Sequence, residues 1–360
     1  MFRSGDDWRG AFDASFDHTD YPLLVPAALT RYWTCLGSER AWPGACLGIA
    51  FTLATIGVAV TATANCRRWS LGLLAGMVLL GTVRLLRWGA LQYADVPLAF
   101  FFLATICLLG IHEQQRSARD GQASTGLLTL AGLMTGLAAW TKNEGFVFAA
   151  VVSFVRPTYI AVQLGWKQSL REGLCLLAGA LPVLFVWLLF KSQVSGVNDL
   201  ASSQGFAETT GRLVDPVRHL TIWRALFSAG FQVGHVFMAV IPLCFWLLGR
   251  RIPTMVERHN LRLSFVILGL MLLAYDIAYL TTPYDLKWHL STSVDRLLVQ
   301  LWPTAVLVIF SQLRAPEEVW PIPESGAGLL TLHPANSRDL AAKGSVTVSR
   351  KSASIVIMEP

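Results

Sequence analysis

Charged residues are scarce in this sequence. Only 14% of its 360 residues are charged and 54% are hydrophobic, whereas about a quarter of the residues are charged in soluble domains. The mean hydropathy is +0.50. This balance excludes a disordered chain, a basic nucleic-acid-binding protein and an ordinary cytosolic enzyme. The sequence therefore indicates a protein that spans a membrane several times.

Paired cysteines, metal-ligand motifs and internal repeats are also lacking. The six cysteines are scattered, none forms a CxxC pair, and most lie within or beside apolar runs. We interpret them as small hydrophobic residues that form neither a disulfide framework nor a metal site. The net charge is only +6. In a membrane protein such an excess is typical of cationic loops that face anionic lipid or an anionic substrate, and no nucleic-acid partner is expected.

Long apolar runs dominate what is present. A bilayer core needs about 20 apolar residues per helix, and nine segments approach that length. They are Pro43–Thr63, Ser70–Leu86, Val96–Ile111, Gly126–Trp140, Gly145–Leu164, Gly173–Phe190, Phe231–Leu248, Leu263–Leu280 and Leu297–Leu313. Two further stretches, Tyr21–Leu36 and Val217–Phe227, are expected to lie at the membrane interface. The predicted fold is therefore all-α, a polytopic bundle of about nine transmembrane helices.

Three regions are expected along the chain: an outer loop with an interfacial helix at 1–42, the transmembrane bundle at 43–313 and a disordered cytoplasmic tail at 314–360. The tail is predicted because Pro, Glu, Ser, Gly and Lys replace the apolar runs there. Residues 1–20 hold five aspartates and no apolar segment typical of a signal peptide. An acidic segment outside a membrane needs an upstream segment to export it, so we expect a first transmembrane helix to be missing.

The loop charges predict an orientation. If the amino terminus faces outside, the inner loops carry 11 cations and four acids, whereas the outer side without the tail carries 13 cations and 14 acids. The inner cations lie in short loops, which are the loops that the positive-inside rule weighs. The sequence therefore predicts an outer amino terminus.

Polar residues gather in four segments on the outer side in this orientation. The segments are His18–Pro22, Gln92–Leu98, Trp140–Gly145 and Thr282–Leu290, with Asp295 and Arg296 shortly after the last. Polar and aromatic clusters on one membrane face predict a single site at the water interface. We assign catalysis to Asp95 and Asp20. The expected substrate-binding residues are His18, Tyr21, Tyr93, Lys142, Glu144, His289 and Arg296.

Each candidate also has a structural explanation. Asp95 precedes an apolar helix, as an N-cap residue does. Lys142 could extend from a helix end into water, with Glu144 as its partner. His18 and Asp20 could cap the interfacial helix, and His289 could be a histidine at the membrane interface whose hydrogen bonds are satisfied. Arg296 is harder to explain in this way, because a charge that opens an apolar helix is costly unless it is paired or used.

Acids and cations at an outer membrane surface suit the transfer of a sugar from a polyprenyl phosphate. Lys142 and Arg296 would hold the phosphate leaving group, and a carboxylate would act as general base on the acceptor hydroxyl. A proton-coupled transporter with Asp276 and Asp95 as proton carriers is an alternative, although transporters usually show internal repeats and helices broken near the midplane. A third hypothesis is a non-catalytic protein that takes part in the assembly of envelope polysaccharide.

Five short motifs, in their order and spacing, resemble bacterial GT-C membrane glycosyltransferases. They are His18–Pro26, Tyr93–Leu98, Thr141–Gly145, Trp288–Leu290 and Asp295–Leu298. The sequence is similar to the dolichyl-phosphate-mannose–protein mannosyltransferase-like group, which includes the aminoarabinose lipid A transferase and the Rgt-type lipopolysaccharide sugar transferases. The resemblance runs from about Gly5 to Phe310.

The resemblance implies a GT-C fold, a polyprenyl-phosphate sugar donor, an envelope glycan, lipid or protein acceptor, and an extracytoplasmic active site in the inner membrane. Asp95 matches the family's acidic residue before a Pro-Leu pair, and Lys142 matches the lysine of its Thr-Lys motif, a phosphate ligand. The family's catalytic aspartate lies near the end of the first transmembrane helix, and this sequence begins just after that point. Asp6 and Asp7 are nearby and are further candidates for the catalytic base, although they match the following segment better. Some members use a divalent metal, whereas no HExxH or similar ligand set occurs here.

Overall fold

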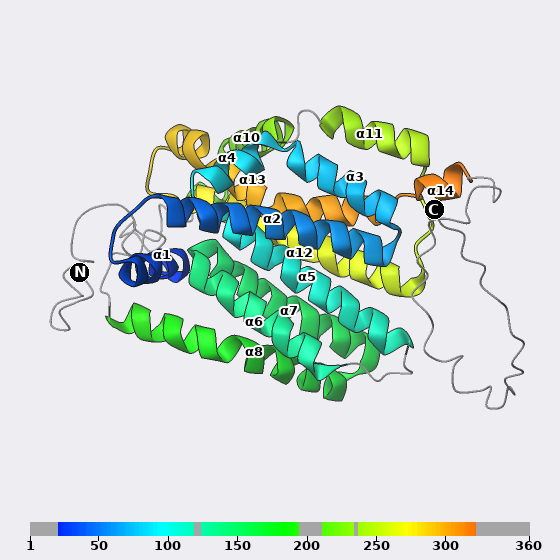
Figure 1. The fold of residues 1–360 in the computed structure, drawn as a ribbon, viewed down its shortest axis with the longest axis horizontal. Helices are drawn as coiled ribbons and strands as arrows, with labels where there is room; N and C mark the ends of the chain where they lie inside the picture. Colours follow the sequence, from blue (N-terminus) through cyan, green and yellow to red (C-terminus); the bar gives the residue numbers. More distant parts are fainter. Residues whose placement is uncertain (1–20, 119–123, 194–210, 234–236, 322–360) are drawn as a thin grey trace, which may run out of the picture. The chain divides into compact units, whose positions relative to one another are not determined.

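The computed structural model describes residues 21–118, 124–193, 211–233 and 237–321, and this part of the chain is almost entirely helical (Figure 1). Its helices are α1 (Leu24–Leu36), α2 (Trp42–Cys66), α3 (Trp69–Leu80), α4 (Val83–Ala90), α5 (Asp95–Ala118), α6 (Thr125–Thr141), α7 (Asn143–Leu164), α8 (Trp166–Gln193), α10 (Pro216–Val233), α11 (Phe237–Leu248), α12 (Met255–Thr281), α13 (Leu286–Phe310) and α14 (Pro316–Val319). The predicted all-α fold is confirmed. The chain divides into two compact units, Met1–Val319 and Trp320–Pro360, and the sites described below belong to the first.

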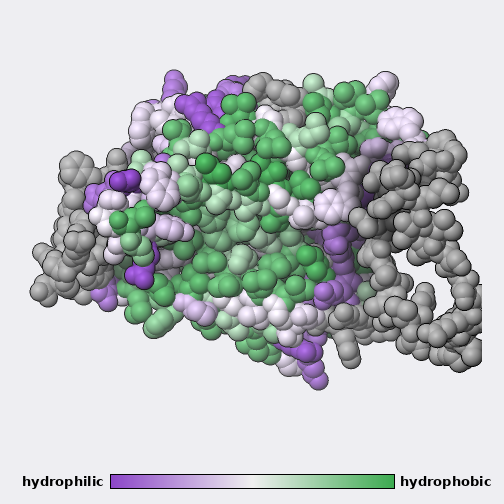
Figure 2. Space-filling view, viewed as in Figure 1, coloured by the Kyte–Doolittle hydropathy of each residue, from purple (hydrophilic) through white to green (hydrophobic). Residues whose placement is uncertain are grey.

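Within the described ranges, six helices are long and apolar enough to cross a membrane: α2, α5, α7, α8, α12 and α13. The bent pair α3 and α4 adds a seventh if it counts as one span, whereas α6 and residues 239–248 of α11 are shorter apolar helices. Figure 2 shows hydrophobic side chains across the middle of one face and hydrophilic ones toward its edges. The chain is a multi-pass membrane protein, and the number of nine spans stays a prediction.

Helices α5 and α13 form the centre of the bundle. In their most apolar windows 72% and 67% of the residues are buried, against 22% in α8. The large side chains that α8 leaves exposed recur at helical spacing. Among them are Leu170, Leu174, Leu177, Leu181, Phe185 and Leu188. A stripe of this kind fits contact with lipid, because a large apolar surface is unfavourable in water.

Small residues let α6 and α8 pack closely. A Cβ atom on Gly132 of α6 would collide with the carbonyl oxygen of Leu176, and one on Gly179 of α8 would collide with that of Thr129. Close contact through glycine is typical of membrane helices, whose association is driven by packing. The contact fixes α6, whose carboxyl end leads into Lys142.

The second expected span, Ser70–Leu86, is bent. The axes of α3 and α4 differ by 63°, and the Thr82 hydroxyl between them accepts a hydrogen bond from the indole of Trp302. Helix α4 carries Arg84 and Arg87, and charged side chains are costly in the apolar core. The bend instead brings Arg84 within 2.9 Å of Asp295 on α13.

A buried charge network joins α5, α7 and α8 at the end of the bundle opposite Asp95. Arg156 of α7 is fully buried and pairs with Glu113 of α5 and Glu172 of α8, and Arg116 pairs with the same two carboxylates. Two cations and two acids balance, so the network stabilises the contact of the three helices without a net buried charge. In the orientation count above these residues belong to inner loops. They are buried within helices instead, and setting them aside leaves nine cations and two acids in the segments that were counted as inner.

Candidate active site

Three polar segments that are distant in sequence meet at one end of the bundle. Asp95 is the first residue of α5, Lys142 separates α6 from α7, and Arg296 lies in the third turn of α13. Helix α5 packs against both α6 and α13, so its amino-terminal end lies beside the other two segments. Apolar packing of the helix bodies therefore brings the polar ends together.

Lys142 forms two ion pairs. Its Nζ atom lies 2.9 Å from Oδ1 of Asp95 and 3.0 Å from Oε1 of Glu144. The Lys142 side chain is 7% exposed and the Asp95 side chain 1% exposed, and buried charges of this kind need partners. Lys142 therefore does not extend from the helix end into water, whereas its expected pairing with Glu144 is present.

The Asp95 carboxylate has a further partner that the sequence did not indicate. Gln300 of α13 donates from Nε2 to Oδ1 of Asp95 at 2.6 Å, and its Oε1 accepts from the hydroxyl of Tyr275 on α12 at 2.7 Å. Both side chains are buried. A lone amide inside an apolar helix is costly unless it is hydrogen-bonded, and this was the one signal that could have identified Gln300.

Aromatic faces flank the two cations. The guanidinium of Arg296 lies 5.2 Å from the ring centroid of Tyr93, and the Lys142 ammonium lies 5.9 Å from that of Tyr21. Both distances fall within the range of about 6 Å in which a cation is attracted to an aromatic face. The predicted residues Tyr93 and Tyr21 thus contact the predicted cations.

In the cluster of Asp95, Lys142, Glu144 and Arg296, three buried polar atoms have no hydrogen-bond partner among the described residues. They are Oδ2 of Asp95, Oε2 of Glu144 and Nε of Arg296. Buried polar atoms are normally hydrogen-bonded, so the unused hydrogen-bonding capacity of these three atoms makes them candidates for contact with a bound molecule. The two carboxylate oxygens accept hydrogen bonds and the Arg296 N–H donates one, which matches a molecule that carries both hydroxyl groups and an anionic oxygen.

His289 and Asp276 have partners of their own. Nδ1 of His289 lies 2.8 Å from the Thr282 hydroxyl. Oδ2 of Asp276 lies 3.0 Å from Nδ1 of His219 on α10. Asp276, which the transporter alternative assigns as a proton carrier, thus pairs with His219 and joins α12 to α10.

His219 makes this contact dependent on pH. Its Nε2 lies 2.9 Å from the carbonyl oxygen of Leu213, so both ring nitrogens face acceptors and the doubly protonated ring suits the position. The hydrogen bond to Leu213, followed by the carboxylates of Asp276 and Asp215, raises the pKa of His219 above its ordinary value. A raised pKa stabilises the folded state at low pH, and this stabilisation is lost as the pH rises through the raised value.

We therefore expect the melting temperature in detergent to decrease as the pH rises from about 6.5, the ordinary pKa of histidine, through the raised pKa of His219. His219→Gln should reduce this fall, and His259→Gln should leave it unchanged. An equal pH dependence in the His219 variant and in the unaltered protein would contradict the assignment.

A divalent metal does not fit the cluster around Lys142. Asp95 and Glu144 each keep one unpartnered oxygen, but the Lys142 ammonium lies between the two carboxylates and repels a second cation. Within the described ranges no three His, Cys, Asp or Glu side chains form a metal-binding group. The remaining predicted residues lie outside the described residues. They are Asp6, Asp7, His18 and Asp20.

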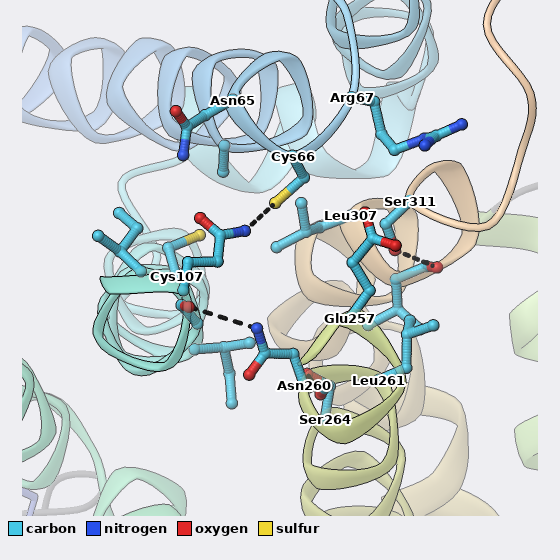
Figure 3. A pocket seen from close by; sticks show the side chains of 16 residues that line it. Asn65, Cys66, Arg67, Cys107, Glu257, Asn260, Leu261, Ser264, Leu307 and Ser311 are labelled. Carbon is cyan, nitrogen blue, oxygen red and sulfur yellow. Dashed lines mark hydrogen bonds between the residues drawn. The ribbon is translucent and has the colours of Figure 1, made fainter. Parts of the chain in front are cut away.

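A cavity lies at the opposite end of the bundle, between α2, α5, α12 and α13 (Figure 3). Its empty volume is about 650 Å³, which includes space open to solvent. Cys66 accepts a hydrogen bond from Gln114, and Asn260 donates one to the carbonyl oxygen of Gly110. The predicted site residues do not line it.

Comparisons with family models and with curated proteins find no match. Among solved structures, the chain is similar to ArnT from Cupriavidus metallidurans, whose crystal structure contains undecaprenyl phosphate. The TM-score is 0.52 and the sequence identity 15%, over 81% of this chain and 49% of ArnT. The chain therefore spans about half the length of that protein, and at this identity the likeness concerns the fold alone. The chain therefore has a membrane-protein fold similar to that of ArnT.

Proposed function

We propose that the chain is a membrane glycosyltransferase that uses a polyprenyl-phosphate sugar donor. The observation that carries the proposal is the cluster of Asp95, Lys142 and Arg296, in which unpartnered carboxylate oxygens lie near an unpartnered guanidinium N–H. Such a donor requires oxygen atoms that accept hydrogen bonds from the sugar hydroxyls and, beside them, a cation that binds the phosphate. The likeness to ArnT bound to undecaprenyl phosphate supports this proposal.

The two cations have different roles in this proposal. Lys142 is already neutralised by two carboxylates, so its main effect is to keep Asp95 charged in a buried place. Arg296 stacks on Tyr93 and has a free N–H, which makes it the phosphate ligand. Guanidinium groups suit phosphate oxygens because their planar donors match the geometry of the anion.

Asp95 is the proposed general base. The acceptor hydroxyl gives its proton to the free Oδ2 atom, and its oxygen attacks the anomeric carbon of the donor sugar. The bond from that carbon to the phosphate oxygen breaks, and polyprenyl phosphate leaves with the electron pair. A base placed opposite the leaving group inverts the configuration at the anomeric carbon.

The site is proposed to face the extracytoplasmic side of the inner membrane, with an envelope glycan, lipid or protein as acceptor. The charge distribution supports this orientation. With the four buried network residues set aside, the loops and helix ends counted as inner carry nine cations and two acids, a cationic excess of the kind that cytoplasmic segments show.

Arg296→Gln tests the phosphate assignment. The variant should lower the affinity for undecaprenyl phosphate by about 10- to 100-fold, because a hydrogen bond to a charged group contributes about 1.5–3 kcal/mol. The measurement is binding to the purified protein in detergent. Arg258→Gln, at the opposite end of the bundle on α12, is the matched control. Equal affinity of the Arg296 variant and the unaltered protein would exclude Arg296 as the phosphate ligand.

A further inference from the structure

Gln300 holds the candidate base on one side only. Its amide nitrogen donates to Oδ1 of Asp95, which also receives the Lys142 ammonium. Oδ1 therefore has two donors, whereas Oδ2 has no partner among the described residues. The carboxylate is thus fixed by one oxygen and keeps the other available.

Tyr275 determines which end of the Gln300 amide faces Asp95. An amide presents either its oxygen or its NH₂ group after a half-turn. Because the Tyr275 hydroxyl donates to Oε1 of Gln300 at 2.7 Å, the NH₂ group is directed to Asp95. The reversed amide would place its oxygen against the carboxylate, where both groups are acceptors and repel each other. All three side chains are buried, so water cannot readily replace a missing partner.

We propose that Tyr275 and Gln300 are positioning residues, which orient Asp95 so that Oδ2 faces the hydroxyl of the sugar acceptor. The proposal rests on the proposed function, because it assigns to the two residues a role in the transfer step itself. Neither residue touches the reacting atoms. Loss of either should lower the turnover number without weakening donor binding, since the phosphate ligand Arg296 belongs to another part of the site.

The experiment compares Tyr275→Phe, Gln300→Met and the double variant with the unaltered chain in a sugar-transfer assay. Gln300→Met should lower kcat by about 10- to 100-fold, the range of a hydrogen bond to a charged group, and Tyr275→Phe by about 2- to 10-fold, the range of a neutral hydrogen bond. Both should leave the donor KM unchanged. The double variant should lose no more than Gln300→Met alone, because Tyr275 acts through Gln300. Tyr279→Phe is the matched control, since it removes another buried tyrosine hydroxyl bond on α12, to Ser293.

Tyr275→Phe removes a single oxygen atom, so the test remains valid if Gln300→Met fails to fold. Unchanged kcat in the Tyr275 variant would overturn the positioning role and leave the proposed function intact. An equal loss of kcat in the Tyr275 and Tyr279 variants would also overturn it, because the effect would then be a general consequence of losing a buried bond. If the unaltered chain neither binds donor nor transfers sugar, the proposed function fails, and the positioning role fails with it.

Discussion

Replacing Asp95 by Asn is expected to reduce sugar transfer by about 100- to 10,000-fold, the range for loss of a general base. Asn keeps the size of the side chain but cannot take the proton of the acceptor hydroxyl. The protein should still fold, because Lys142 retains its pair with Glu144 at 3.0 Å. The measurement is the transfer rate per amount of folded protein in detergent or in liposomes.

Asp285→Asn is the matched control for this variant. Asp285 is the N-cap of α13, where its side chain accepts a hydrogen bond from the backbone N–H of Trp288, and Asn caps a helix about as well as Asp. The control should keep nearly full activity. If Asp95→Asn is equally active, Asp95 is only a structural partner of Lys142 and the proposed base is wrong.

Replacing Lys142 by Met should have the largest effect on stability. The change leaves Asp95 charged, buried and without its cation. Removal of one partner from a buried ion pair lowers the free energy of unfolding by about 3–5 kcal/mol. Met retains much of the volume of the lysine side chain, so the loss reflects charge more than packing. Unfolding in detergent should show the decrease as a lower midpoint of the melting curve.

Lys287→Met is the control, because Lys287 is exposed at the same end of the bundle and surface charges contribute little to stability. The double variant Lys142→Met with Asp95→Asn should regain part of the lost stability, since the unpaired charge is then removed. A Lys142→Met protein as stable as the unaltered one would show that the ammonium does not compensate Asp95.

The sequence predicted the polar residues at helix ends far better than those inside helices. Asp95, Lys142 and Glu144 lie at helix ends and stand out because each borders an apolar run, where charge is costly. Arg296 borders an apolar run in the same way but lies in the third turn of α13. Gln300 carries no charge, so its only signal is the cost of a lone amide among apolar residues. Its bond to Asp95 spans 205 positions of the chain, and no local pattern encodes a contact of that length.

Two features of the fold escaped prediction for a related reason. The run Ser70–Leu86 is apolar almost throughout, so nothing in its hydropathy marks the 63° bend, which depends on contacts of Thr82 with distant residues. Arg156 lies within the expected span Gly145–Leu164, but it was counted among the inner-loop cations and no buried network was expected around it. Its acidic partners come from α5 and α8, and only the packing of these helices brings them to it.

Photo-crosslinking with a polyprenyl phosphate that carries a reactive group beside the phosphate tests the central claim most directly. The proposed site predicts labelling of peptides that contain residues 84–96, 140–146 and 284–300, and competition by undecaprenyl phosphate but not by a polyprenol without phosphate. Labelling confined to peptides around the opposite cavity, at residues 257–264 and 307–311, would contradict the claim.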